Sequence, residues 1–336
     1  MASFIVRRLA AGVLVIFGVV TITFFLMSVV PSDPASQWAG PRATEEQRAQ
    51  AREELNLDKP LAVQFGIFLN KLGHFDLGES LANKRSVADQ MKEFLPPTLE
   101  LVAVAFILAA LIGIPLGVFS AQKKDRLPDH LSRVIAVGAV AMPSFWLAMM
   151  LQLIFFRWLR ILPLGGQLNS YYTLLEPIPR ATGFLFIDTL LAGNVSAFFD
   201  YCRHIIMPAI ALGAGTLATL ARMTRSGMLE IANEDYILAA RSYGLGEGIV
   251  MWKLGLKNSL GPTVTVSALQ LGYILVNTFM IEAIFNWPGI GNYVSTAVTT
   301  LDYPAIIAVT LLSAVSYVVL NMIADILVAL DPRVRV

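Results

Sequence analysis

Long apolar runs alternate with polar segments along the whole chain. A membrane-spanning helix needs about 20 mostly apolar residues. Runs of that length lie at Leu9–Val30, Leu99–Ala121, Leu131–Leu159, Ile205–Met223, Val264–Phe285 and Ile306–Leu330. The pattern therefore predicts an all-α integral membrane protein with six transmembrane helices. The fourth run is short and rich in glycine, so its prediction is the weakest of the six.

The composition agrees with this pattern. Of the 336 residues, 56% are hydrophobic and 15% are charged, whereas soluble domains average about 45–50% and about 25%. The single cysteine, Cys202, excludes an internal disulfide and a cysteine-cluster metal site. The three histidines, His74, His130 and His204, are scattered, which argues against zinc or haem. We therefore expect no metal site and no cofactor on this chain.

The first apolar run follows Arg7 and Arg8, as the core of a signal peptide would. However, Leu9–Val30 is longer than such a core, which usually has about 7–15 residues, and no small-residue cleavage site follows promptly. We expect a retained first span rather than a cleaved signal.

The distribution of Lys and Arg predicts the orientation of the spans. With the N-terminus inside, basic residues gather in the short inner loops and tails, while the short outer loop Asn286–Pro304 has none. We therefore expect both termini in the cytoplasm. The expected organisation is a cytoplasmic N-terminus and first span (1–30), an external segment (31–97), and a transmembrane core (98–336) with an external insert (160–203) and a cytoplasmic loop (225–262).

Both long external segments contain signals for short helices. Thr44, with Gln47 three residues on, predicts a helix start in which the two side chains cap each other's backbone. The second segment contains the apolar patch TGFLFIDTLLAG at 182–193. It predicts a short re-entrant or interfacial helix.

Polar residues recur at helical spacing in the last two spans. They are Ser267, Gln270 and Asn277 in the fifth span, alternating with Ile274 and Ile281, and Ser313, Tyr317, Asn321 and Asp325 in the sixth. Such a face lines a polar pathway or forms hydrogen bonds between helices, and the sequence does not favour one over the other. Glu282 and Asp325 lie near span ends, within reach of the membrane surface, so neither is a convincing proton relay.

Glycine and proline interrupt other spans, at GIPLG (113–117), MPSFW (142–146) and MPAIALGAG (207–215). Proline bends a helix and glycine permits close approach of two helices. Kinked helices suit a protein that moves between two states, but they also occur in static bundles.

Sequence motifs for catalysis are missing. There is no phosphate-binding GxxxxGK[ST] loop, and Gly244-Leu245-Gly246-Glu247-Gly248 neither follows a strand nor precedes the required Lys. No HExxH or GxSxG occurs, and no His, Cys and Asp residues suggest a nucleophile with its base. An enzyme is therefore disfavoured. A secondary transporter built from inverted repeats is also disfavoured, because we find no internal repeat.

The polar stretch Asp235–Pro262 separates two apolar runs. Asn233–Asp235 predicts a capped helix start, Gly244 the end of that helix, and EGIVMWKLGLKNSL a second amphipathic stretch before Pro262 and the next span. The small residues Ala239, Ala240 and Gly244 suit the groove of another protein. The alternative is a solvated amphipathic loop at the membrane surface.

This stretch resembles a known family. The order D-Y-I, A-A-R-x-x-G-L and L-K-N-S-L-G-P is similar to the "EAA" loop of permease subunits of binding-protein-dependent ABC importers, in the dipeptide/oligopeptide/nickel branch. FIVRRL, FDLGES, MPSFWLAMM, IEAIFNWPGIGNYV and NMIADILVALDPRVR extend the resemblance over nearly the whole chain. The insert TGFLFIDTLLAG is most like that of dipeptide permeases. Leu238-Ala239, Tyr243 and Lys253-Leu254 depart from the usual pattern, which bears on the details of docking.

The resemblance implies the type I importer permease fold and a set of partners. They are a second homologous permease, two cytoplasmic ATPase subunits that use ATP and magnesium, an extracytoplasmic solute-binding protein, a peptide substrate and membrane lipid, but no nucleic acid. The loop that couples to the ATPases would be formed by Asp235, Tyr236, Ala239, Ala240, Arg241, Gly244 and Leu245. The resemblance also implies a location in the bacterial inner membrane. The polar spacing of the last two spans gives the expected residues of the translocation pathway: Ser267, Gln270, Asn277, Ser313, Tyr317 and Asn321.

The expected function is therefore ATP-driven import of di- or oligopeptides by alternating access, with hydrolysis in separate subunits. One alternative is the same architecture importing nickel or another small solute. The other, from a different class, is a membrane scaffold or channel whose loop anchors a soluble partner.

Overall fold

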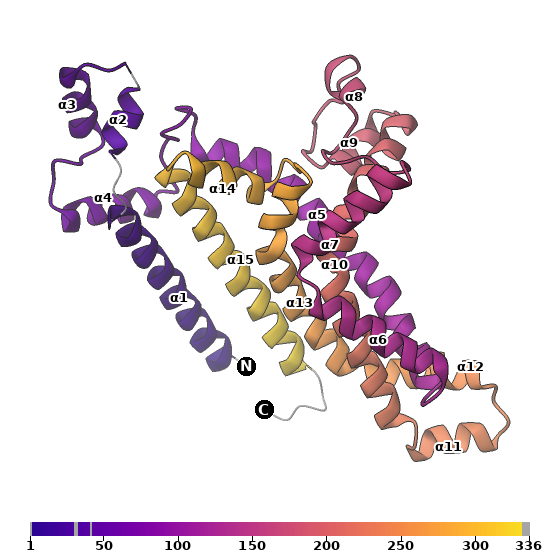
Figure 1. Cartoon of the computed structure of the whole chain (residues 1–336). Helices are drawn as coiled ribbons and strands as arrows, with labels where there is room; N and C mark the ends of the chain where they lie inside the picture. The colour runs from indigo at the N-terminus through magenta and orange to yellow at the C-terminus, as the bar shows by residue number, and fades with distance from the viewer. Residues whose placement is uncertain (1, 30–32, 41, 331–336) are drawn as a thin grey trace. The chain divides into compact units, whose positions relative to one another are not determined.

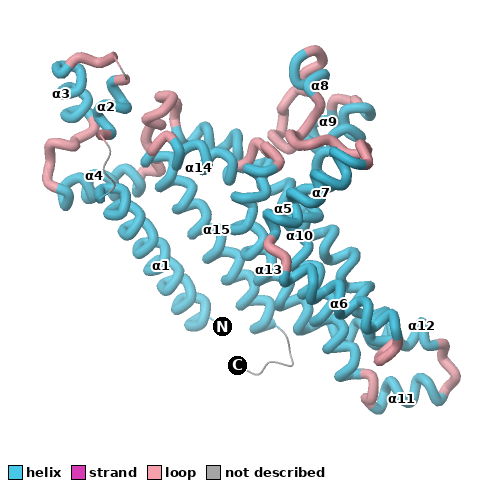
Figure 2. Tube along the Cα trace, viewed as in Figure 1, coloured by secondary structure: helices cyan, strands magenta, loops and turns pink. Residues whose placement is uncertain are grey.

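The computed structural model describes residues 2–29, 33–40 and 42–330. Over these residues the chain is helical, with loops between the helices and one isolated bridge between Glu79 and Ser86 (Figure 2). It divides into two compact units, described here one at a time. Unit 1 comprises Met1–Pro96 and Gly289–Val318, and unit 2 comprises Pro97–Pro288 and Val319–Val336. The helices α5 (Val87–Gln122) and α15 (Tyr303–Leu330) contribute to both.

Unit 1 begins with the helices α1 (Ala2–Val29), α2 (Pro34–Ala39), α3 (Glu45–Glu54) and α4 (Leu61–Gly73). The predicted capping of α3 is confirmed: the Thr44 hydroxyl accepts from Gln47 N at 3.3 Å, and the Gln47 side chain accepts from Thr44 N at 2.9 Å. Phe24 of α1 stacks on Phe68 of α4, with 5.4 Å between ring centroids.

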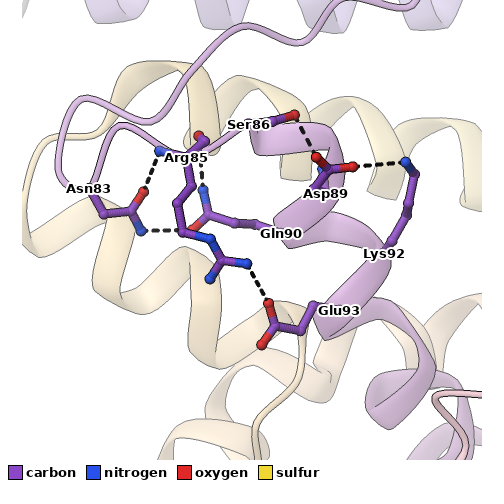
Figure 3. Close-up of polar contacts among 7 residues, drawn as sticks. All are labelled: Asn83, Arg85, Ser86, Asp89, Gln90, Lys92 and Glu93. Carbon is purple, nitrogen blue, oxygen red and sulfur yellow. Dashed lines mark hydrogen bonds and ion pairs between the residues drawn. The ribbon is translucent and has the colours of Figure 1, made fainter. Parts of the chain in front are cut away.

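Side-chain bonds fasten the start of α5 within unit 1 (Figure 3). Asn83 donates to Gln90 at 2.9 Å, Arg85 binds Glu93 at 2.8 Å, and Lys92 binds Asp89 at 2.9 Å. These bonds hold the turn before the helix to its first two turns. As a result α5 begins at Val87, inside the stretch that sequence alone assigned to the external segment, and it continues through Pro96 and Pro97.

The core of unit 1 joins this helix start to the late part of the chain. Val87 and Met91 pack against Ile290 of α14 (Ile290–Thr299) and Ala305 of α15. The buried carboxylate of Asp302 accepts from the Ser80 hydroxyl and from Leu81 N. Residues more than 200 positions apart are therefore fixed to each other by both apolar and polar contacts.

Unit 2 is organised around its longest helix, α10. Its elements are the rest of α5, α6 (Leu127–Ala141), α7 (Ser144–Leu151), η1 (Gln152–Trp158), α8 (Ser170–Leu174), α9 (Leu185–Leu191), α10 (Val195–Ile231), α11 (Asp235–Ser242), α12 (Glu247–Ile249), η2 (Val250–Gly255) and α13 (Leu256–Ile284). Helix α10 packs against α13, α6, α7 and α9. Of its most apolar 18-residue stretch, 67% is buried. The short helix α9 confirms the helix predicted in TGFLFIDTLLAG.

Glycines allow α5 and α10 to cross closely, as expected from GIPLG. A Cβ atom at Gly113 would lie 2.6 Å from the carbonyl oxygen of Leu217, and one at Gly213 would lie 2.7 Å from that of Ala105. No side chain fits at those distances, so the two backbones are in direct contact. Helix association in lipid depends on such packing, because lipid tails are as apolar as the helices.

The third predicted span is broken. Helices α6 and α7 are bent by 106° around Met142 and Pro143. Proline lacks the N–H that would continue the helix, and it drives the residue before it into the extended conformation. Met142 has φ −80° and ψ 128° accordingly. The predicted run Leu131–Leu159 is therefore a broken helix, with the bend at the proline that the sequence indicated.

The described residues contain five helices long and apolar enough to cross a membrane, and six when the bent pair is counted as one span. This agrees with the six predicted. The fourth, however, is much longer than Ile205–Met223: the Asn194 side chain caps α10 by accepting from Ala197 N, and Pro208 lies within the helix. Pro262 also lies inside α13 rather than before it.

Candidate functional site

A polar cavity lies beside the bend in unit 2. It has a volume of about 520 Å³ and is lined from α6, α7, α10 and α13, including Pro143, Thr219, Gln270, Tyr273 and Asn277. The bend forms one wall, since residues on both sides of Pro143 line the space. Because the chain is interrupted there, polar groups of α13 face an open volume instead of a packed helix.

Two predicted pathway residues, Gln270 and Asn277, lie in this cavity together. The predicted Ser267 is not among the residues that line it, and its hydroxyl donates to Thr263 O within α13. Of the predicted α15 residues, Ser313 and Tyr317 belong to unit 1 and Asn321 to unit 2. Ile274 and Ile281, which alternate with the polar residues, are fully buried in the core. The polar stripe is therefore only partly a cavity wall.

Gln270 lines the cavity and also links two helices. Its Oε1 accepts from Thr216 Oγ1 of α10 at 3.0 Å, which links two helices. Asn277 Nδ2 donates to Tyr273 O at 2.8 Å within its own helix, so its Oδ1 still offers an acceptor. Sequence reasoning missed Tyr273, although its spacing of three and four residues from Gln270 and Asn277 places all three on one helix face.

Glu282 and Glu100 are buried carboxyl groups of the same unit. Thr98 Oγ1 donates to Glu282 at 2.7 Å, so Glu282 is enclosed between α5 and α13. It is therefore buried, whereas the sequence suggested a position within reach of the membrane surface. Glu100, which sequence reasoning overlooked, accepts from Phe186 N at 2.7 Å. Both carboxyl groups help to hold helices together.

The polar loop follows α10 and leads into α13 (Figure 1). Helix α11 begins at Asp235, as predicted, but its N-cap is Glu234 and no side chain caps it. Gly244 ends the helix with φ +76°, a conformation that favours glycine, and Gly244 N donates to Arg241 O. The second amphipathic stretch is not separate, because α12 and η2 run directly into α13.

One face of α11 is packed and the other is open. Ile237 and Ala240 are buried against Val250. Ala240 therefore cannot be gripped by another protein, contrary to expectation, because it already contacts the chain's own helix. The exposed residues include Tyr236, Leu238, Ala239, Tyr243 and Leu245, with Tyr243 87% exposed.

Arg241 braces the loop. Its guanidinium binds Glu247 at 2.8 and 3.2 Å and donates to Ala232 O at 3.2 Å, which connects α12 to the end of α10. The hydrogen-bonded carboxylate of Glu247 raises the pKa of the Arg241 guanidinium above its ordinary value. Asp235, by contrast, is an exposed residue in the first turn of α11, where its negative charge suits the helix dipole.

A second arginine pair, which sequence reasoning missed, lies in the C-terminal part of α10, before the loop. Arg225 of α10 binds Asp129 of α6 through two nitrogens, at 2.7 and 2.8 Å. Asp129 is completely buried and also accepts from Ser120 Oγ and Asp125 N. In the sequence, Asp129 and Arg225 are single charged residues beside apolar runs. Their pairing is visible only in the fold.

Comparison with known proteins covers almost the entire chain. The family model described as "Binding-protein-dependent transport system inner membrane component" matches residues 113–336, and the model for the N-terminal part of such membrane components matches residues 1–102.

Curated relatives match over the full length. The probable D,D-dipeptide transport system permease protein of Escherichia coli is 40% identical, covering 99% of this chain and 97% of its own. The di/tripeptide transport system permease protein of Pseudomonas aeruginosa is also 40% identical, covering 100% and 99%. The glutathione transport system permease protein of Escherichia coli is 32% identical, covering 100% and 99%.

Proposed function

Because the chain belongs to the family of binding-protein-dependent transport system inner membrane components, we propose that it forms part of the route by which an ABC importer moves small peptides across the bacterial inner membrane. The chain is a multi-pass permease subunit, and ATP hydrolysis belongs to separate subunits of the importer. The relatives named for dipeptides, di- and tripeptides and glutathione support a peptide substrate over nickel, and over a scaffold that only anchors a partner.

In this proposal α11 is the coupling helix. The observation that carries it is the exposed surface of Tyr236, Leu238 and Tyr243, which are 40%, 46% and 87% exposed on a helix whose other face is packed. Aromatic side chains are enriched among the residues that dominate protein interfaces. Asp235, Ala239, Arg241, Gly244 and Leu245 complete the coupling loop: Arg241 and Gly244 set its shape, and the others border the exposed surface.

The partners follow from this assignment. A cytoplasmic ATPase subunit would take α11 into a cleft, and a second ATPase would serve a second, homologous permease. A solute-binding protein would deliver the peptide on the opposite side, where the external segments lie. Both termini and α11 would then be cytoplasmic, in line with the basic residues of the inner loops.

The cavity beside the bend would be this chain's part of the pathway. Gln270 and Asn277 supply amide groups, and Tyr273 a hydroxyl and an aromatic face, which suit the amides and carboxylate of a peptide. Ser267, Ser313, Tyr317 and Asn321 remain proposed pathway residues. For these the support is the polar spacing along α13 and α15.

The coupling surface is tested by charge insertion. Tyr243→Asp and Leu238→Asp should weaken binding of the purified ATPase subunit roughly 30-fold, since central interface residues contribute about 2 kcal/mol or more. Tyr171→Asp is the matched control, because Tyr171 is 50% exposed on α8, outside the loop. Normal ATPase binding and transport in both loop variants would contradict the proposal.

The pathway is tested separately by Asn277→Leu in the intact importer. Peptide uptake should fall while the ATPase subunits remain bound, because the change alters the cavity and leaves α11 untouched. Unchanged uptake of every peptide tested would remove Asn277 from the pathway.

A further inference from the structure

A second pocket in unit 2 has a different character from the cavity beside the bend. It has a volume of about 320 Å³ and lies between the last turns of α5, the middle turns of α6 and the C-terminal part of α10. We call it the arginine pocket; its polar lining residues are Ser120, Ser132, Arg133, Arg222, Arg225 and Ser226.

Positive charge is in excess in the arginine pocket. Three arginines and no carboxylate line it, and the neighbouring Asp129 is already bound by Arg225 through two nitrogens. Arg133 lies 3.9 Å from Asp129 and donates to His130 at 2.7 Å. Arg222 forms no ion pair with any residue that the structure describes. Two cationic side chains therefore face the pocket without a carboxylate of their own.

The buried pair holds the pocket's shape. Arg225 joins α10 to Asp129 of α6, and Ser120 Oγ joins Asp129 to α5 at 2.5 Å. Below them a Cβ atom at Gly117 would lie 2.5 Å from Ala221 O, so α5 and α10 are in direct backbone contact. The three helices that line the pocket are thus fixed before any ligand arrives.

The pocket borders an exposed apolar surface. Val134, Ile135 and Val137 of α6 are 69%, 62% and 63% exposed, although α6 belongs to a candidate membrane span. Leu116 and Ala136 continue this apolar surface into the pocket wall. A ligand that fits both parts has an anionic group on a hydrocarbon body.

We propose that the arginine pocket binds the phosphate headgroup of an anionic phospholipid, whose acyl chains lie along the exposed face of α6. Basic pockets between helices at the membrane surface are suited to such headgroups. Arg133 and Arg222 bind the phosphate and the Ser226 hydroxyl donates to one of its oxygens. The bound phospholipid then holds α6 against α10.

Lipid titration of the purified full-length chain in its importer complex tests this, with bound lipid counted by native mass spectrometry. Phosphatidylglycerol should bind in preference to phosphatidylcholine. Each basic residue near a membrane surface adds about 1 kcal/mol of attraction, so the double variant Arg133→Gln/Arg222→Gln should bind phosphatidylglycerol roughly 30-fold more weakly. Arg222→Lys, which keeps the charge, should bind nearly as the parent does.

The matched control is Lys124→Gln/Arg126→Gln. It removes the same charge from exposed positions in the turn between α5 and α6, outside the pocket, and should leave phosphatidylglycerol binding within about twofold of the parent's. Both double variants should melt at the parent temperature in detergent without lipid, which separates lipid binding from folding.

Three outcomes would overturn the proposal. One is equal binding of the two phospholipids, and another is an equal loss in both double variants. The third is binding of glycerol 3-phosphate as tight as that of phosphatidylglycerol, which would assign the pocket to a soluble anion. None of these outcomes bears on peptide import or on α11, so failure here leaves the proposed function untouched.

Discussion

Arg225 and Arg241 each bind a carboxylate through two nitrogens, but one pair is enclosed between helices and the other is exposed on the loop. Arg225 and Asp129 are 96 residues apart, and the Asp129 side chain is completely buried. Arg241 and Glu247 are six residues apart, with side chains 35% and 55% exposed. The first joins two spans, and the second only closes a loop.

This difference shows that two arginine pairs near the same end of α10 have different roles. Removing one partner of a buried pair leaves a charge without solvation, which is strongly destabilising. An exposed pair is worth about 0–1 kcal/mol, since water solvates both partners almost as well. The buried pair therefore fixes the arrangement of helices, while the exposed pair shapes α11 and can open at little cost when a partner binds.

The largest expected effect is on the buried pair. Arg225→Met should lower the free energy of unfolding by about 3 kcal/mol, because Asp129 stays buried without its cation. Thermal melting in detergent measures the loss, with Arg126→Gln as the control for an exposed arginine. The double variant Asp129→Leu/Arg225→Met should recover much of the stability. If the double variant is no better than the single one, the stranded charge is not the cause.

Gly117→Ala should have the next largest effect. The new methyl group would lie 2.5 Å from Ala221 O and 2.7 Å from the Thr224 Cβ, next to the buried pair. Overpacking of this kind typically costs about 1–3 kcal/mol. Gly138→Ala is the matched control, because nothing lies within 4 Å of its Cβ position on α6. Equal melting temperatures for the two variants would show that α5 and α10 can separate freely there.

Gly244→Ala tests the shape of the exposed loop. No atom lies near the new Cβ, so the only cost is the left-handed conformation at φ +76°, about 1 kcal/mol for alanine. Gly244→Asn should cost less, because asparagine tolerates this conformation. Chemical denaturation measures both variants. The reverse order of stability would mean that the loop does not retain this turn.

Arg241→Gln should have the smallest effect on stability, about 0.5 kcal/mol, and this effect should shrink further in high salt. Its effect on ATPase coupling should be larger than on melting, since Arg241 positions α11 relative to α10. The charge-swapped variant Arg241→Glu/Glu247→Arg should restore coupling. A destabilisation as large as that of Arg225→Met would abolish the distinction between the two pairs.

Local rules explain why some features could be predicted from the sequence. Thr44 and Gln47 cap each other within four residues, Gly244 ends α11, and Pro143 bends its span. Each needs only the chemistry of neighbouring residues. The six apolar runs were visible for the same reason, because the membrane requires a minimum length of apolar helix.

Other features depend on contacts between distant residues. Asp129 pairs with Arg225, and Thr98 donates a hydrogen bond to Glu282, only after the helices have packed. Ala240 looks suitable for a partner's groove by size, yet Val250 covers it from the far side of the loop. Gln270 entered the cavity and Ser267 did not, although both belong to the same polar spacing. Helical periodicity identifies which residues share a helix face, but not what that face packs against.

The bend at Pro143 also has a consequence for water. Proline has no N–H, so the carbonyl of Ala139, which would accept it in a continuous helix, loses its helical donor. Ala139 lines the cavity beside the bend, and non-helical backbone within a membrane is tolerated only where protein or water covers it. A water molecule in the cavity can donate to that carbonyl whichever side chains line the space. A peptide that enters can then exchange part of its hydration shell for such water.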